Sequence, residues 1–269
     1  MESPVEFGKV WAMTKRDMLN WASYRSQILT SLLGATIGIA TWALLGTYNP
    51  TPVTYYNTTY TSFLVTGILI FSLIAPISRG LDSRLAAWTL ETVLMTGMRT
   101  STFVLGTVAW GYVLALVFLV PQVAVAVLLF NVQFSVNITS LVLAIGISSL
   151  IGFSLSMITA GFRVVTKVTD PFTWAMSVGQ SLFAGMTFPI QHLDSYISGI
   201  STFCWILPQT WIYHIFRLSI LEDASVLSPG IASAFLGALL FALILLPIGL
   251  WVFRWGMARA KREGTLGWF

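Results

Sequence analysis

The sequence predicts an all-α integral membrane protein with six transmembrane helices, an N-terminal amphipathic interfacial helix and a re-entrant outer helical hairpin between spans five and six. Three observations lead to this prediction. Apolar residues make up 56% of the 269 residues and charged residues only 9%, whereas an average soluble protein has about 25% charged residues. Apolar runs of membrane-spanning length recur along the chain. Lysine and arginine are confined almost entirely to every second segment between these runs.

Residues 1–27 are expected to form an amphipathic helix on the cytoplasmic side of the membrane. Ser3, Pro4 and Glu6 favour a helix start, because they supply a capping side chain, a first-turn proline and a capping-box acid. A helix with one apolar arc lies in the headgroup region, with its tryptophans toward the acyl chains and its cations toward water. The apolar arc comprises Phe7, Val10, Trp11, Thr14, Met18, Trp21 and Ala22, and the opposite face comprises Lys9, Arg16, Asn20 and Ser23.

A six-span transmembrane domain is expected over residues 28–253. A helix needs about 20 largely apolar residues to cross the hydrocarbon core. The runs that approach or exceed this length are 28–45, 62–77, 103–130, 138–162, 171–189 and 231–253.

The positive charges orient these spans. All but one of the 14 lysines and arginines lie in segments 1–27, 78–102, 163–170 and 254–269, and none lies in 46–61 or 131–137. Positive residues stay on the cytoplasmic side. The pattern therefore predicts a multi-pass protein of the cell (plasma) membrane with both termini cytoplasmic, residues 254–269 being a basic tail. Arg217 is the exception, because it falls in an outer segment.

A charged helix is expected over residues 80–100, between spans two and three. Leu81, Leu85, Trp88 and Met95 share one side of this helix by their spacing. A charged, half-apolar helix is a poor membrane crosser, but it is a suitable contact for a protein on the aqueous side. Its charged residues are Asp82, Arg84, Glu91 and Arg99, with Arg79 just before it.

The outer segment 190–222 is too apolar for a solvated loop. If it crossed the membrane once, the basic tail would lie outside, against the charge rule. A helical hairpin that enters from the outer face and returns, with a break near Pro208, satisfies both constraints. Such backbone is tolerated at membrane depth where protein or an aqueous cavity surrounds it. The alternative is an amphipathic pair that packs on the outer ends of the spans.

The chemistry of the sequence argues against an energy source within the chain. Five of the spans contain no Asp, Glu, Lys or His, so an internal proton relay is not expected. No phosphate-binding loop of the G-x-x-x-x-G-K-[ST] type is present. Two histidines and one cysteine form no zinc pattern, and His192 and His214 are expected to make local hydrogen bonds at the outer rim. We therefore predict no catalytic residue, cofactor site or metal site in this chain, and no nucleic-acid partner.

Two further motifs concern packing and modification. Gly34 and Gly38 form a G-x-x-x-G motif, which lets helices approach closely within one chain or between two. Asn57 and Asn137 begin N-glycosylation sequons, and both lie in loops that the charge pattern places outside.

Four features, taken in order along the chain, resemble the permease subunits of ABC-2-type exporters. They are the amphipathic helix before span one, the sequence TLETVLMT at 89–96, the FPI at 188–190, and the LPQTW at 207–211 followed by Phe216-Arg217. The chain departs from the family pattern at Thr96-Gly97, where Thr-Pro is usual, and at Gln209-Thr210-Trp211, where Leu-Thr-Tyr is commoner. These departures weaken the transfer of individual residue roles.

The resemblance implies a permease powered by a separate cytoplasmic ABC ATPase, which would bind the ATP and magnesium. It implies that two permeases, either identical copies or paralogues, pair around a central path in the bilayer. The coupling helix would dock on the ATPase, and the outer hairpin would partly close the path. The implied ATPase-coupling residues are Asp82, Arg84, Trp88, Glu91 and Arg99. The implied outer-gate residues are Phe188, Pro189, Pro208, Trp211 and Arg217.

Two other classes of function compete with the exporter. A membrane-embedded lipid-modifying enzyme would need polar groups gathered near one interface, and the outer hairpin offers His192, Asp194, His214, Arg217, Glu222 and Asp223. A membrane anchor or assembly subunit would bind a partner without transporting anything. The transported substrate is not specified by the sequence.

Overall fold

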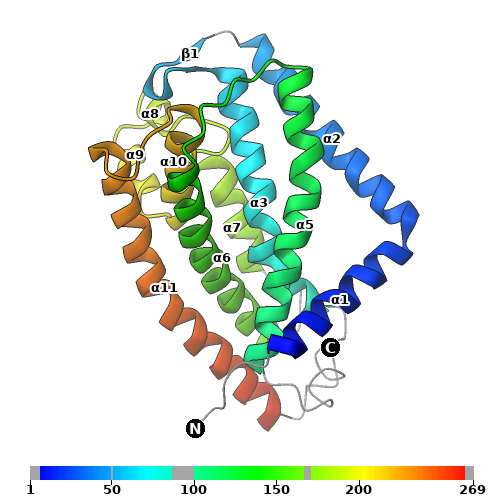
Figure 1. Cartoon of the computed structure of the whole chain (residues 1–269). Coiled ribbons are helices and arrows are strands. Elements are labelled where there is room, and N and C mark those ends of the chain that lie inside the picture. Colours follow the sequence, from blue (N-terminus) through cyan, green and yellow to red (C-terminus); the bar gives the residue numbers. More distant parts are fainter. Residues whose placement is uncertain (1–6, 50, 87–99, 167–170, 264–269) are drawn as a thin grey trace.

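The computed structural model describes residues 7–49, 51–86, 100–166 and 171–263. Within these ranges the chain forms ten α-helices, one 3₁₀ turn and a sheet of two short antiparallel strands (Figure 1). The elements are α1 (Phe7–Ser23), α2 (Arg25–Tyr48), β1 (Pro52–Val53), η1 (Thr54–Tyr56), β2 (Thr58–Thr59), α3 (Tyr60–Ala86), α5 (Thr100–Leu128), α6 (Ile138–Thr166), α7 (Pro171–Leu182), α8 (Ile190–Leu193), α9 (Ile200–Cys204), α10 (Pro208–Leu221) and α11 (Pro229–Arg262).

Five of the described helices are long and apolar enough to cross a membrane. They are α2, the Tyr60–Ile77 part of α3, most of α5, all of α6 and most of α11. Four of them contain a predicted span, and α5 covers all of 103–130 except the last two residues. Five of the predicted spans are therefore helices that are long and apolar enough to cross a membrane. In Figure 1 they run along the bundle, and α2 leans away from the others toward its start.

The prediction of a membrane-spanning helix over 171–189 is wrong. The helix in this region, α7, has 12 residues, which is about 18 Å at 1.5 Å per residue and shorter than a hydrocarbon core of about 30 Å. After Leu182 the chain is irregular up to α8. Gly185 has a φ of 78°, which a right-handed helix cannot include, and Pro189 is extended. An apolar composition alone does not reveal this break.

The main core lies where α6 packs along α11 and α3. Three glycines permit close contact between the α6 and α11 backbones: a side-chain carbon at Gly161, Gly249 or Gly256 would lie 2.5–2.7 Å from a carbonyl oxygen of the other helix. Small residues at such crossings are the usual means of close packing between membrane helices. A second apolar cluster joins α1, α5, α6 and α11 at one end of the bundle. We call this the α1 end.

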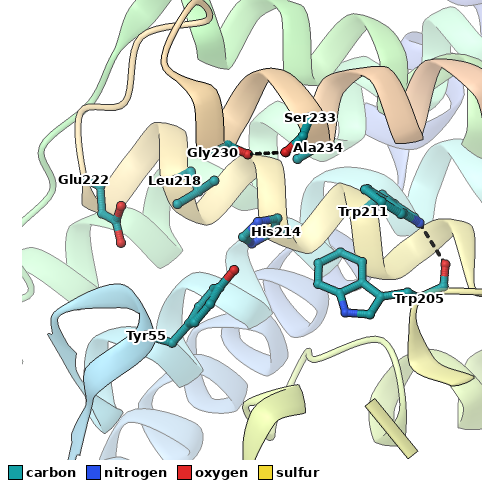
Figure 2. Close-up of a pocket in the computed structure, with 9 residues that line it drawn as sticks. All are labelled: Tyr55, Trp205, Trp211, His214, Leu218, Glu222, Gly230, Ser233 and Ala234. Atoms are coloured by element: carbon teal, nitrogen blue, oxygen red, sulfur yellow. Dashed lines mark hydrogen bonds between the residues drawn. The ribbon is translucent and has the colours of Figure 1, made fainter. Parts of the chain in front are cut away.

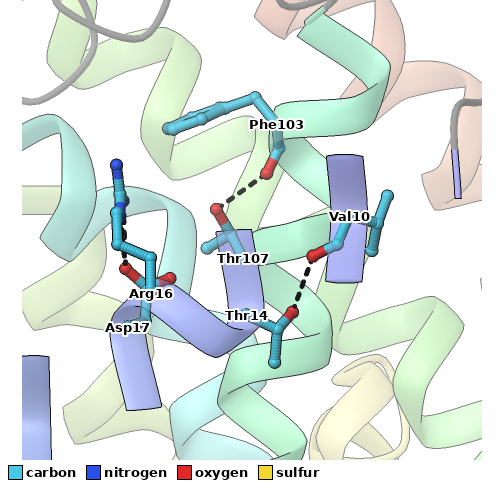
Figure 3. A network of polar contacts seen from close by, with 6 residues as sticks. All are labelled: Val10, Thr14, Arg16, Asp17, Phe103 and Thr107. Carbon is cyan, nitrogen blue, oxygen red and sulfur yellow. Dashed lines mark hydrogen bonds and ion pairs between the residues drawn. The ribbon is translucent and has the colours of Figure 1, made fainter. Parts of the chain in front are cut away.

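Helix α1 is confirmed as a helix and packs against the start of α5 at the α1 end. Met13 is buried against Gly106, and Trp21 contacts Trp110 and Phe118 edge-on. The hydroxyl groups of Thr14 and Thr107 at this contact donate to backbone carbonyls of their own helices, as Figure 3 shows. The two helices therefore meet through apolar groups. Phe7 and Trp11 are 80% and 66% exposed, as expected for side chains that would meet lipid. The neighbouring Arg16 and Asp17 form an ion pair 2.9 Å long, also drawn in Figure 3.

The opposite end of the bundle, which we call the hairpin end, holds β1, β2, the 129–137 connection and α8 to α10. The predicted break near Pro208 is confirmed, since Pro208 is the first residue of α10. Helix α10 runs antiparallel to the first turns of α11: Trp211 lies beside Gly237, whereas Leu218 and Gly230 border one cavity. The C-terminal part of α10 bonds to the 129–137 connection, because Ser219 O accepts from the backbone N–H of Asn137. The N-terminus of α10 is therefore farther from the hairpin end than its C-terminus.

The charged helix predicted over 80–100 does not begin as a separate element. Residues 80–86 continue α3 without a break. The remaining residues of the predicted helix, 87–99, lie outside the described part of the chain. The described part of the charged segment thus lies on the same helix as the second span.

Candidate functional site

The candidate site is at the hairpin end, where the chain between α7 and α8 leaves helical structure. The carbonyl groups of Gly185 and Met186 point at Arg217 of α10. Its Nη1 donates to Gly185 O over 2.5 Å, and its Nη2 donates to Met186 O over 3.0 Å. A buried carbonyl needs a hydrogen-bond partner, and Arg217 supplies the partners that these two carbonyls do not find in a helix.

Arg217 also ties this irregular segment to α3. Its side chain is 1% exposed, and the guanidinium carbon lies 3.6 Å from the centroid of the Phe63 ring. A desolvated cation over an aromatic face is worth about 2 kcal/mol. Among the described residues no carboxylate pairs with Arg217. Carbonyl oxygens and the rings of Phe63, Tyr56 and Tyr213 surround this buried charge instead.

Two side-chain hydrogen bonds connect α10 to other elements, one of them partly buried and the other buried. Gln180 of α7 donates from Nε2 to the Tyr213 hydroxyl over 2.9 Å. The Tyr56 hydroxyl and His214 Nδ1 share a bond of 2.9 Å, and burial raises the pKa of Tyr56, which keeps the phenol neutral. His214 thus makes a hydrogen bond at this end of the bundle, as predicted, and its partner Tyr56 lies 158 positions away in the sequence.

Helix α10 presents a second face to a cavity of about 420 Å³ (Figure 2). Trp211, His214, Leu218 and Glu222 follow one another at spacings of three and four, so they form one stripe along the helix. Tyr213 and Arg217 lie on the side that meets α3 and α7. The helix thus separates a closed, hydrogen-bonded cluster from an accessible cavity. Tyr55, Trp205, Gly230, Ser233 and Ala234 complete the cavity lining.

The predicted outer-gate residues fall around α10. Pro189 and Arg217 border the same buried cluster, and Pro208 is buried at the start of the helix. Trp211 is on the cavity side, where its indole Nε1 donates to Trp205 O over 2.8 Å. Phe188 is 46% exposed, and it borders neither the cluster nor the cavity.

The structure describes only two of the five predicted ATPase-coupling residues. Asp82 and Arg84 lie in the last turns of α3. Trp88, Glu91 and Arg99 lie outside the described residues. The structure thus describes the helix that leads into the predicted coupling segment.

The predicted packing and glycosylation residues lie at exposed or capping positions. A side-chain carbon added at Gly34 or Gly38 would meet no atom within 4 Å, so neither glycine serves a close contact within the described part of the chain. Asn57 is exposed in a turn with a φ of 42°. Asn137 caps α6, since its Oδ1 accepts from the backbone N–H of Ser140.

The polar residues considered for an enzyme do not share one cavity. Of the six, only His214 and Glu222 line the 420 Å³ cavity. Asp194 accepts a hydrogen bond from the backbone N–H of Ser201, and Arg217 is engaged by carbonyl groups. In the described ranges, no group of three His, Cys, Asp or Glu side chains could hold a metal ion.

Several residues of this site were not predicted. Tyr56, Phe63 and Tyr213 read as ordinary aromatic residues of an apolar chain. Gln180 was the one sequence signal that pointed to a polar partner such as Tyr213, because an amide inside an apolar run needs a hydrogen-bond partner.

Comparison with known proteins leaves the family open. No protein-family model matches the chain, and no curated protein matches it.

Proposed function

We propose that this chain is the transmembrane permease subunit of an ATP-driven exporter, powered by a separate cytoplasmic ATPase. The observation that carries the proposal is the continuity of α3. One helix of 27 residues, about 40 Å long, joins the charged residues Asp82 and Arg84 to Phe63, on which Arg217 stacks. A force applied at the charged end would reach the hairpin end through one continuous helix, which contains Pro76 between the two ends.

The proposed orientation places the α1 end in the cytoplasm and the hairpin end outside. The positive-charge pattern supports this orientation. In the proposed topology, α7 and residues 183–189 together make the fifth of the six crossings, although only α7 is helical. The bond from the Tyr60 hydroxyl to Thr187 O supports this path, since it brings residue 187 beside the outer start of α3. The re-entrant hairpin is then α8 to α10, with the N-terminus of α10 inside the outer leaflet.

The proposed translocation path forms between two copies of this chain, or between it and a paralogue. Helix α2 supports this part of the proposal, because only 11% of its apolar window is buried within the chain. Gly34 and Gly38 lie open on this helix and would allow a second helix to approach closely.

Purification of the chain from its native membrane in mild detergent, with mass spectrometry of the bound proteins, tests the proposal. We expect a stoichiometric soluble ATPase. Isolation of a stable chain without an ATPase would contradict the exporter and favour the enzyme or the anchor.

A charge reversal then tests the coupling segment. Glu91→Arg is expected to reduce retention of the ATPase and the ATPase activity of the complex, while leaving the amount of membrane-inserted chain unchanged. Glu263→Arg is the matched control, because Glu263 is exposed in an ion pair with Arg259 and lies on the same proposed side. Normal coupling in Glu91→Arg would remove the role of Glu91.

A further inference from the structure

The 420 Å³ cavity at the hairpin end has the size of a small-molecule site. Such sites enclose about 300–1,000 Å³ and combine apolar walls with few polar groups. This cavity lies between the outward stripe of α10, the first turns of α11 and the η1 turn. Figure 2 shows Trp205 and Trp211 at one end and Glu222 at the other, with His214 and Tyr55 between them.

The indole end of the cavity is a fixed apolar surface. The ring centroids of Trp205 and Trp211 lie 4.7 Å apart, and the ring planes form an angle of 61°. The hydrogen bond from Trp211 Nε1 to Trp205 O holds both residues in place. The His214 ring extends this surface. Its centroid lies 5.3 Å from the Trp205 ring centroid and 5.7 Å from the Tyr55 ring centroid. Aromatic walls that are already positioned bind a flat or apolar group without losing further side-chain freedom.

Among the described residues that line the cavity, Glu222 at the other end is the only one with a charged side chain. Glu222 makes no ion pair within the described residues. Arg217 does not neutralise it, because its guanidinium is on the other side of α10 and binds Gly185 and Met186. The cavity therefore has an apolar end and an anionic end.

The remaining polar groups indicate what kind of ligand fits. Two of the polar groups in the lining are already occupied, because the Ser233 hydroxyl donates to Gly230 O and the Trp211 N–H donates to Trp205 O. An anionic ligand would be repelled by Glu222. An ammonium group is attracted both by a carboxylate and by aromatic faces.

We propose that this cavity binds an amphipathic organic cation, with its ammonium group at Glu222 and its ring or short apolar chain against Trp205 and Trp211. The site does not depend on the proposed exporter function, since binding requires only this chain. If the exporter proposal also holds, the cavity lies on the outer side of the membrane.

Three water-soluble probes with the same aromatic body test this site: 2-(1-naphthyl)ethylammonium, 2-(1-naphthyl)ethanol and 3-(1-naphthyl)propionate. Binding to the purified full chain in lipid nanodiscs is measured by isothermal titration calorimetry, after subtraction of empty nanodiscs. We expect the ammonium to bind tightest and the propionate weakest. Glu222→Gln should weaken ammonium binding about tenfold or more and leave binding of the alcohol unchanged.

The matched controls use the same chemical changes at the α1 end. Glu263→Gln and Trp255→Ala should bind all three probes like the wild type, whereas Trp205→Ala should weaken all three. Trp205→Leu, which keeps an apolar side chain, distinguishes loss of the aromatic surface from loss of the fold. Equal binding of the three probes, or unchanged ammonium binding in Glu222→Gln, would overturn the site. Absence of a co-purifying ATPase would overturn the exporter proposal and not this one.

Discussion

Helices α2 and α3 are both apolar enough to cross a membrane, but they differ in how much of each is buried within the protein. Only 11% of the apolar window of α2 is buried within the protein, against 67% for α3. The exposed side of α2 includes Leu29, Leu33 and Ile37. Helix α3 has neighbours on several sides, including α5, α6 and α10. Both helices are thus apolar enough to cross a membrane, but hydrophobicity does not determine which of them forms the core.

The difference originates in the polar groups next to α3. The buried Arg217 stacks on Phe63 of α3 and holds Met186, whose carbonyl oxygen lies against Gly67. In a membrane, apolar packing partners compete with equally apolar lipid tails, so hydrogen bonds and close packing decide which helices associate. Within the described residues, no comparable polar side chain from another element bonds to α2.

Removal of the Arg217 side chain should have the largest effect on this comparison. Arg217→Leu leaves the carbonyls of Gly185 and Met186 buried without partners, at about 1–3 kcal/mol each, so we expect the free energy of unfolding to fall by about 2–6 kcal/mol. Thermal or denaturant unfolding of the purified chain measures the loss. Arg217→Lys should lie between wild type and leucine, because an ammonium keeps the charge and loses the two-pronged geometry. Arg254→Leu is the control, since Arg254 is exposed on α11, and a loss of the same size in both leucine variants would contradict the role of Arg217.

An identical substitution on each helix tests the comparison directly. At Gly67 of α3 an added side-chain carbon would lie 2.2 Å from Met186 O, whereas at Gly38 of α2 it would meet nothing within 4 Å. We expect Gly67→Ala to destabilise the protein by about 1–3 kcal/mol or more through overpacking. Gly38→Ala should be neutral, or stabilising by up to about 1 kcal/mol because alanine favours a helix. Both are measured by the same unfolding assay, and equal effects would mean that the two helices are packed alike.

The same α2 position also reports on the proposed second copy. Gly38→Leu should leave the unfolding of the isolated chain unchanged but reduce cross-linking between copies in the membrane. Unchanged cross-linking would place the contact between copies on another surface.

The sequence predicts the helices of this fold better than it predicts which residues and helices pack against one another. Five long helices and the break at Pro208 follow from apolar run length and from the chemistry of proline. The end of α7 does not, because residues such as Gly185 and Pro189 occur within many continuous membrane helices. The cluster at the hairpin end was also beyond prediction: Arg217 is 32 positions from Gly185 and 154 from Phe63. The sequence marked Arg217 as the one cation outside the cytoplasmic segments, but it gave no indication of its partners.

A smaller effect is expected at the turn that precedes α3. Tyr56→Phe removes the hydroxyl that shares a bond with His214 and keeps the aromatic ring in place. The loss of one buried hydrogen bond should lower the free energy of unfolding by about 1 kcal/mol. Tyr48→Phe, at a tyrosine that is 86% exposed at the end of α2, should change it far less. If the two variants unfold alike, the Tyr56–His214 bond contributes nothing to the packing of α3.

The smallest expected effect concerns Glu222, which lies on the side of α10 that faces away from α3. Partial burial raises the pKa of Glu222 above its usual value of 4.5. The folded protein therefore binds this proton more tightly than the unfolded chain, so the associated stability is present at low pH and is lost as the pH rises through the folded pKa. Asp194 has the opposite sign, because the hydrogen bonds from Ser201 hold its pKa below the usual range, and its contribution is lost as the pH falls.

Melting temperatures at pH 4 and pH 7 separate the two carboxylates. Relative to wild type, Glu222→Gln should gain stability at pH 7 compared with pH 4, and Asp194→Asn should lose it. Because each variant is compared with the wild type at the same pH, the titration of other groups largely cancels. If Glu222→Gln instead lost stability at pH 7 compared with pH 4, as Asp194→Asn is expected to do, the protein would stabilise the charged form of Glu222. It would then have a cationic partner, and the anionic end of the cavity would not be free for a ligand.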